Sequence, residues 1–137
     1  MRAGLDPNVL ISAAISRKGA PAAILRHAEL GDFELVISPQ LLGEFDRALK
    51  YPKVRDRIDA DRQVGIVNTI RLMAWEVADP GYKPSVPCPD PKDEYLISLV
   101  EEERIALVTG DKALQALAPE IPVFSPAQFL ELLRARG

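Results

Sequence analysis

Four acidic residues occupy positions in the sequence where a chemical site could form. Asp6 follows a short apolar segment, and Asp111 follows the apolar run "IALVTG" at 105–110. Asp93 closes a proline-rich loop before a predicted helix, and Glu44 lies about one and a half turns into another helix. In sheets of parallel strands, ligands bind in the crevice outside the carboxyl ends of the strands. We therefore expect the four carboxylates to converge in one crevice.

Four carboxylates in one crevice repel one another, and at least one of them should have a raised pKa if no positive charge is present. A divalent cation removes this conflict, and oxygen ligands suit Mg²⁺ or Mn²⁺. Such an ion commonly serves phosphate chemistry, because it generates a hydroxide and screens the scissile phosphate. Each acid also has a simpler alternative role: a turn or N-cap for Asp6, a solvated helix position for Glu44, and a helix cap for Asp93 or Asp111.

The elements that must position these acids alternate along the chain. The pattern predicts strands at 4–6, 33–38, 75–79, 105–110 and 121–125. It predicts helices at 21–30, 38–50, about 59–73, 94–103, 111–117 and 126–136. Residues 8–16 are apolar and turn back into the fold, and residues 80–93 form a loop stiffened by five prolines. Strands that alternate with helices predict an α/β fold with a parallel sheet of four to five strands and helices on both faces.

Composition restricts the class of protein. A chain of 137 residues with 47% hydrophobic and 27% charged residues is typical of a single globular domain, here 1–137. The single cysteine, Cys88, and the single histidine, His27, argue against an internal disulfide and against a zinc cluster. Neither a signal peptide nor a membrane-spanning run is visible, so we expect a cytoplasmic protein.

Four longer motifs contain these residues. They are "LDPNVLISA" at 5–13, "FELVISPQLLGEFDRAL" at 33–49, "DPKDEYLISLVEEERIALVTGDKAL" at 90–114 and "FSPAQFLELL" at 124–133. Together they resemble the PIN-domain nucleases over nearly the whole chain. The resemblance is greatest to the toxins of toxin–antitoxin pairs, the VapC-type toxins. It implies a three-layer α/β/α fold of the PIN type.

The resemblance also implies an activity and a set of site residues. It implies a metal-dependent endoribonuclease that uses Mg²⁺ or Mn²⁺. The residues it assigns to the metal and to catalysis are Asp6, Glu44, Asp93 and Asp111. It places the polar residues Asn8 and Thr109 near the site to orient the acids, and we add Asp90 to this near-site group. It further implies a homodimer and a small antitoxin protein as partner.

One position departs from the family pattern. Pro7 stands where the family usually has threonine, so a backbone N–H and a hydroxyl are both absent. A catalytically silent PIN-fold module that binds RNA or a protein therefore stays open as an alternative. A phosphoacceptor regulatory domain is a weaker alternative, because the first strand carries one acid rather than a pair and no central strand ends in aspartate.

The charge distribution is compatible with an RNA substrate despite a net charge of −3. Four of the 20 acidic residues are the proposed ligands, and the other acids nearly balance the 17 basic residues. Candidate phosphate contacts lie beside Glu44, at Lys50, Lys53, Arg55 and Arg57. The alternative for this segment is a solvated helix face.

The remaining aromatic and reactive residues receive structural assignments. Tyr51, Tyr82 and Tyr95 could stack on bases, although packing in the core or at the rim is the preferred interpretation. Trp75 is assigned to the core and His27 to the surface or an interface. Cys88 receives no role.

Overall fold

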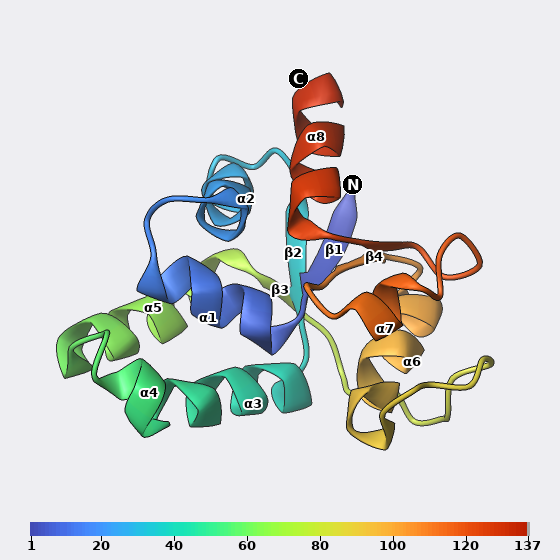
Figure 1. The fold of residues 1–137 in the computed structure, drawn as a ribbon, viewed down its shortest axis with the longest axis horizontal. Coiled ribbons are helices and arrows are strands. Elements are labelled where there is room, and N and C mark those ends of the chain that lie inside the picture. Colours follow the sequence, from blue (N-terminus) through green and yellow to red (C-terminus); the bar gives the residue numbers. More distant parts are fainter. Residues whose placement is uncertain (137) are drawn as a thin grey trace.

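The computed structural model describes residues 1–136, and its centre is a parallel sheet of five strands (Figure 1). The strands are β1 (Arg2–Leu5), β2 (Glu34–Ile37), β3 (Trp75–Glu76), β4 (Ala106–Val108) and β5 (Val123–Phe124). Their order across the sheet is β3-β2-β1-β4-β5, and all four pairings are parallel. The predicted parallel sheet is therefore confirmed.

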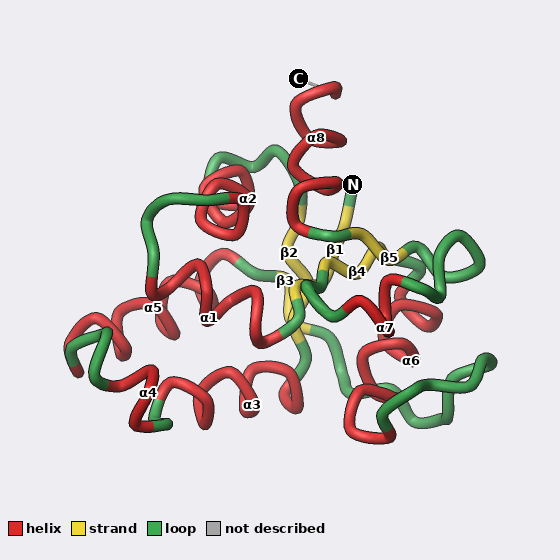
Figure 2. Tube along the Cα trace, in the orientation of Figure 1, coloured by secondary structure: helices red, strands yellow, loops and turns green. Residues whose placement is uncertain are grey.

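Helices flank the sheet on both sides (Figure 2). They are α1 (Pro7–Ile15), α2 (Ala20–Glu29), α3 (Pro39–Leu49), α4 (Pro52–Arg55), α5 (Ala60–Met73), α6 (Glu94–Glu103), α7 (Lys112–Gln115) and α8 (Pro126–Arg136). A short 3₁₀ turn, η1 (Pro91–Asp93), precedes α6. Figure 1 shows α1, α2 and α3 on one side of the sheet and α6 and α7 on the other, which confirms the three-layer α/β/α arrangement.

The core fixes the central strands, because their side chains are buried on both faces. Leu5, Val36 and Val108 are each fully enclosed, as expected for strands covered by helices on both sides. The last helix is held by Phe129, whose ring meets that of Phe33 edge to face at 5.2 Å between centroids. Because β1 and β4 are neighbours in register, with Leu5 opposite Val108, their carboxyl ends lie together.

Three expectations from the sequence need correction. Residues 7–15, left without an assigned element, form the helix α1, and the short helix α4 was not foreseen. The core assignment of Trp75 is wrong, because Trp75 is 56% exposed. It lies on the edge strand β3, which pairs with β2 alone. Strands β2 to β5 are also shorter than predicted, whereas β1 begins two residues earlier than predicted and ends at Leu5.

His27 lies at the surface, as expected, with its Nδ1 2.7 Å from Asp32 Oδ2. Within the described part of the chain, no helix is long and apolar enough to cross a membrane.

Candidate active site

The site begins where β1 and β4 end side by side. The Asp6 amide extends the ladder beyond β1 by donating to the Val108 carbonyl at 2.9 Å. Directly after Val108 come Thr109, Gly110 and Asp111, the last of which is the N-cap of α7. Asp6 is in turn the N-cap of α1. The two loops that carry predicted acids are thus held against each other at the carboxyl edge of the sheet.

Asp6 is buried, with 7% of its surface exposed, and both of its carboxylate oxygens are held by donors. Oδ1 accepts the Asn8 amide at 2.9 Å, and Oδ2 accepts the Thr109 hydroxyl at 2.7 Å. Pro7 is the first residue of α1, where a backbone N–H has no partner inside the helix and proline is favoured. The contacts that orient Asp6 therefore do not use the groups that Pro7 lacks. Asn8 acts here through its main chain rather than its side chain.

Thr109 links the two loops. Its hydroxyl is fully buried, donates to Asp6 and accepts the Asp111 amide at 3.0 Å. The Asp111 carboxylate caps α7 by accepting the Ala113 amide at 2.8 Å. The cap role considered for Asp111 is therefore present in the structure, alongside any role toward a ligand.

Glu44 and Tyr95 form a contact across the site. Glu44 lies on α3, which starts at the Ser38 cap after β2. Its Oε2 accepts the Tyr95 hydroxyl of α6 at 2.6 Å. Burial raises the pKa of Tyr95, and the hydrogen bond to Glu44 raises it further, so this hydroxyl keeps its proton and donates. Tyr95 is packed, as predicted, but its hydrogen bond to Glu44 was not predicted.

A cavity of about 290 Å³, here called the acid cavity, opens between these elements. Of the predicted site residues, Asp6, Asn8, Glu44, Asp90 and Asp93 line it, whereas Asp111 does not. The pKa of Asp93 is raised to about 6, first by burial and then by the charges of Asp6, Asp90, Asp111 and Glu44. The predicted repulsion among the acids is therefore present, and it includes Asp111.

The cations of the acid cavity differ from those proposed from the sequence. Arg47, one turn after Glu44, and Lys92, next to Asp93, both line it. Tyr51 also lines the acid cavity and is 60% exposed. It therefore does not pack in the core. Within residues 1–136, none of the proposed cations Lys50, Lys53, Arg55 and Arg57 lines this cavity. The helical spacing between Glu44 and Arg47 was a signal that could have identified Arg47.

The chain is similar in sequence to a known protein family. A model of the PIN domain family matches residues 2–113, which is most of the chain. The chain belongs to the PIN domain family. It is also similar to the uncharacterized protein MJ1680 of Methanocaldococcus jannaschii, with 27% identity over 93% of this chain and 88% of that protein.

A solved structure shares the fold of this PIN domain. It is described as the crystal structure of VapBC2 from Rickettsia felis bound to a DNA fragment from their promoter. The TM-score is 0.64 at 14% identity, and the match covers 91% of this chain and 98% of that one. At this level of identity the likeness concerns the fold.

The donor set of this PIN domain fits a hard divalent ion that keeps part of its water shell. Its candidate ligands are all carboxylate oxygens, the donors that Mg²⁺ and Mn²⁺ prefer. Within the described residues, no three acidic, histidine or cysteine side chains are gathered closely enough to hold a metal ion by themselves, so water would have to supply the remaining ligands. Mg²⁺ usually binds through one or two carboxylates and several waters, which a half-open cavity of this kind can accommodate. Burial is the main cause of the raised pKa of Asp93, and the neighbouring negative charges, which such an ion would offset, raise it further.

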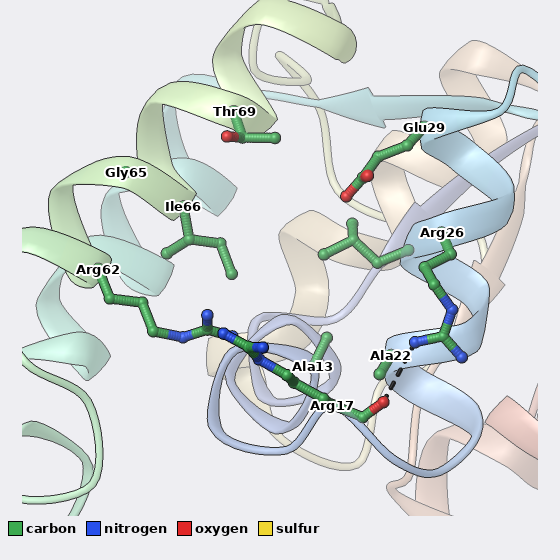
Figure 3. Close-up of a pocket in the computed structure, with 10 residues that line it drawn as sticks. Ala13, Arg17, Ala22, Arg26, Glu29, Arg62, Gly65, Ile66 and Thr69 are labelled. Carbon is green, nitrogen blue, oxygen red and sulfur yellow. Dashed lines mark hydrogen bonds between the residues drawn. The ribbon is translucent and has the colours of Figure 1, made fainter.

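A second cavity, of about 460 Å³, lies away from the acids between α1, α2 and α5 (Figure 3). Apolar side chains such as Ile66 line it together with Arg17, Arg26 and Arg62. Two of these arginines are held by main-chain oxygens. Arg62 donates twice to the Ala14 carbonyl, at 3.2 and 3.3 Å, and Arg26 donates to the Arg17 carbonyl at 3.1 Å.

Proposed function

We propose that this PIN domain is a metal-dependent endoribonuclease and the toxin of a toxin–antitoxin pair. PIN domains are generally nucleases, and the finer assignment rests on one observation. Carboxylates from three separate segments line a single cavity at the carboxyl edge of the sheet, where burial first and then the charges of the neighbouring acids raise the pKa of Asp93 to about 6. A cavity in which acids outnumber cations in this way is expected where a divalent cation and a phosphodiester must bind.

The roles follow from the contacts. Asp6, Glu44, Asp93 and Asp111 are the proposed ligands of Mg²⁺ or Mn²⁺, one or two of them binding the ion directly and the others, including Asp111 outside the acid cavity, acting through its bound water. When bound, the ion supplies a nucleophilic hydroxide and stabilises the charge on the scissile phosphate. Thr109 and the Asn8 amide fix the Asp6 carboxylate, and Tyr95 fixes that of Glu44. Buried donors that hold an acid in one orientation lower the cost of assembling the site.

The cations of the acid cavity complete the proposal. A phosphodiester brings a negative charge into a cavity that is already acidic, so its own oxygens need positive partners. Arg47 and Lys92 line the same cavity as the acids and can contact those oxygens. Asp90 caps the turn η1 by accepting the Lys92 amide at 3.0 Å, which places Lys92 beside the acids.

The test is cleavage of a pool of single-stranded and structured RNA with Mg²⁺, Mn²⁺ or EDTA. We expect cutting that depends on the metal and that is lost in Asp6→Asn. The matched control is Asp56→Asn, which changes an exposed acid at the end of α4 and should cut like the wild type. If folded wild-type protein cuts no RNA with either metal, the nuclease assignment fails and the silent binding module takes its place.

We further propose that the second cavity receives the antitoxin. The solved structure with this fold is described as one of VapBC2, and this cavity is lined by apolar side chains and three arginines, with Glu29 as its one acidic lining residue within residues 1–136. Such a surface fits an amphipathic segment with acidic flanks. The test is co-expression of the chain with candidate antitoxins, scored by rescue of growth. Ile66→Glu should abolish rescue of growth while leaving RNA cleavage intact, and unchanged rescue would remove this surface from the proposal.

We also propose a homodimer that forms in the cytoplasm through α5 and β3. Only Ile70 of α5 is buried, whereas Leu72 is 89% exposed and Val64 and Trp75 are also largely exposed. An apolar patch of this kind on a helix beside an edge strand can pair with its copy. Light scattering after gel filtration should give twice the mass of one chain for the wild type and one mass for Leu72→Lys. A monomeric wild type would contradict the proposal.

A further inference from the structure

A third cavity, here called the side cavity, adjoins the acid cavity. Its volume is about 350 Å³. Gln40 and Glu44 of α3 line one part, Tyr82 and Lys83 of the proline-rich loop line another, and Tyr95 of α6 lines a third. Glu44 and Lys92 line both cavities, so the two share a wall. A ligand strand that leaves the acid cavity past Lys92 enters the side cavity directly.

We propose that the side cavity binds the single-stranded RNA that flanks the scissile phosphate, with a base stacked on Tyr82 and a phosphate on Lys83. This inference rests on the proposed ribonuclease function and extends it to a substrate-binding subsite. Tyr82 and Lys83 are positioning residues in this proposal, because they lie outside the acid cavity and touch the strand rather than the reacting atoms.

The chemistry of the side cavity suits a nucleotide strand. Tyr82 is 50% exposed, so half of the residue is open to contact with a base, and stacking on an aromatic ring tolerates every base. Within residues 1–136, neither Lys83 nor Lys92 forms an ion pair with a carboxylate, which leaves both ammonium groups for phosphates. Glu44 and Glu94 also line the cavity, so the strand must present its phosphates to the lysine side.

The wall that carries Tyr82 is held in place before any ligand binds. Asp79 Oδ1 accepts the Gln40 amide at 3.0 Å, which ties the start of the loop to α3. Further along, the Ser85 amide donates to Glu101 Oε1 of α6 at 2.8 Å, and its hydroxyl donates to Oε2 of the same carboxylate. Pro80 and Pro84, on either side of Tyr82, restrict the backbone between these two anchors. A wall fixed in this way loses little conformational entropy when it binds a strand.

The experiment compares KM and kcat for a single-stranded RNA decamer and a dinucleotide. We expect Tyr82→Leu and Lys83→Gln each to raise KM for the decamer about fivefold or more, with kcat unchanged. Tyr82→Phe keeps the aromatic face and should behave as the wild type. The dinucleotide has no flanking strand to reach the side cavity in this proposal, so its cleavage should be the same in all variants. Lys83→Gln should also reduce, by about 0.7, the slope of the logarithm of the association constant for the decamer against the logarithm of the salt concentration.

The control is Lys53→Gln, which removes the same charge from α4, outside both cavities. If the wild type cuts the decamer and the Tyr82 and Lys83 variants match it, the side cavity is not a subsite, although the ribonuclease proposal stands. An equal rise in KM for Lys53→Gln would overturn the subsite in favour of general charge. If the folded wild type cuts neither RNA, the function and the subsite fail together.

Discussion

Replacing Asp93 by asparagine should stabilise the metal-free protein at neutral pH. The pKa of Asp93 is raised from 3.8 to about 6 by burial and by neighbouring acids. A shift of one pKa unit corresponds to about 1.4 kcal/mol, so a shift of this size would be worth about 3 kcal/mol for a fully buried group. Asp93 is only half-buried, and solvent screening reduces the expected gain for Asp93→Asn to about 1 kcal/mol.

The sign of the pH dependence follows from the direction of the shift. Because the folded pKa lies above the unfolded value, the folded protein binds more protons than the unfolded chain between about pH 4 and 6. The wild type therefore loses stability as pH rises through this window, whereas the asparagine variant loses none at this position. The difference between them should be full at pH 7.5 and should shrink to about a few tenths of a kcal/mol at pH 4.5.

Urea unfolding in EDTA at the two pH values measures this difference, with Asp56→Asn as a control that should show no such dependence. Mn²⁺ should reverse the order at pH 7.5, because a ligand that binds the folded state stabilises by about 2.7 kcal/mol at 100 times its Kd. The reasoning is refuted if Asp93→Asn is less stable than the wild type in EDTA at pH 7.5. It is also refuted if the two proteins differ equally at both pH values.

Substitutions at three other positions, Thr109, Tyr95 and Pro7, test how the acids are held. Thr109→Val removes the buried donor to Asp6 and should lower the free energy of unfolding in urea by about 1–3 kcal/mol. Thr109→Ser keeps the hydroxyl and should recover most of the loss. Equal stability of the two variants would contradict the role of the hydroxyl. Tyr95→Phe removes the hydrogen bond to Glu44 and should weaken Mn²⁺ binding, measured by calorimetry, several-fold. It should also lower the free energy of unfolding by about 1 kcal/mol. Unchanged affinity for Mn²⁺ would show that this contact is only structural. Pro7→Thr should leave RNA cleavage within about twofold and lower stability by about 0.5 kcal/mol, and a large gain in cleavage would mean that Pro7 impairs the site.

The arrangement of the acids was predictable because each follows a local pattern. Asp6 comes directly after a buried strand, and Asp111 lies three residues after the end of another. The parallel topology brings these strand ends together. Asp93 precedes α6 in a motif with clear turn residues. Strand alternation and capping residues therefore located the crevice without any knowledge of long-range packing.

Other features depend on packing that no local pattern reveals. Helix α1 is buried at six of its nine positions, so it lacks the polar stripe that marks an amphipathic helix. The Tyr95 contact with Glu44 joins residues 51 positions apart, and only the fold brings them together. Trp75 was misassigned because its size favours burial, whereas its place on the edge strand exposes it.

The basic residues show the same limit. Charge density along the sequence pointed to 50–57, where cations are frequent, but the direction of each side chain depends on how α3 and α4 are placed. Arg47 and Lys92 reach the acid cavity because they share a turn with Glu44 and Asp93. The nearest cations along the helix and the turn were better candidates than the densest cluster.

The most direct test of the metal site is a titration of the metal-free protein with Mn²⁺, followed by electron paramagnetic resonance. The account predicts that the wild type binds Mn²⁺ in the acid cavity and that Asp6→Asn and Asp93→Asn each weaken this binding at least about tenfold, a loss of about 1.4 kcal/mol. Asp56→Asn should bind as the wild type does. Equal affinity in all four proteins, or no binding by folded wild type, would contradict the claim that these acids form a metal site.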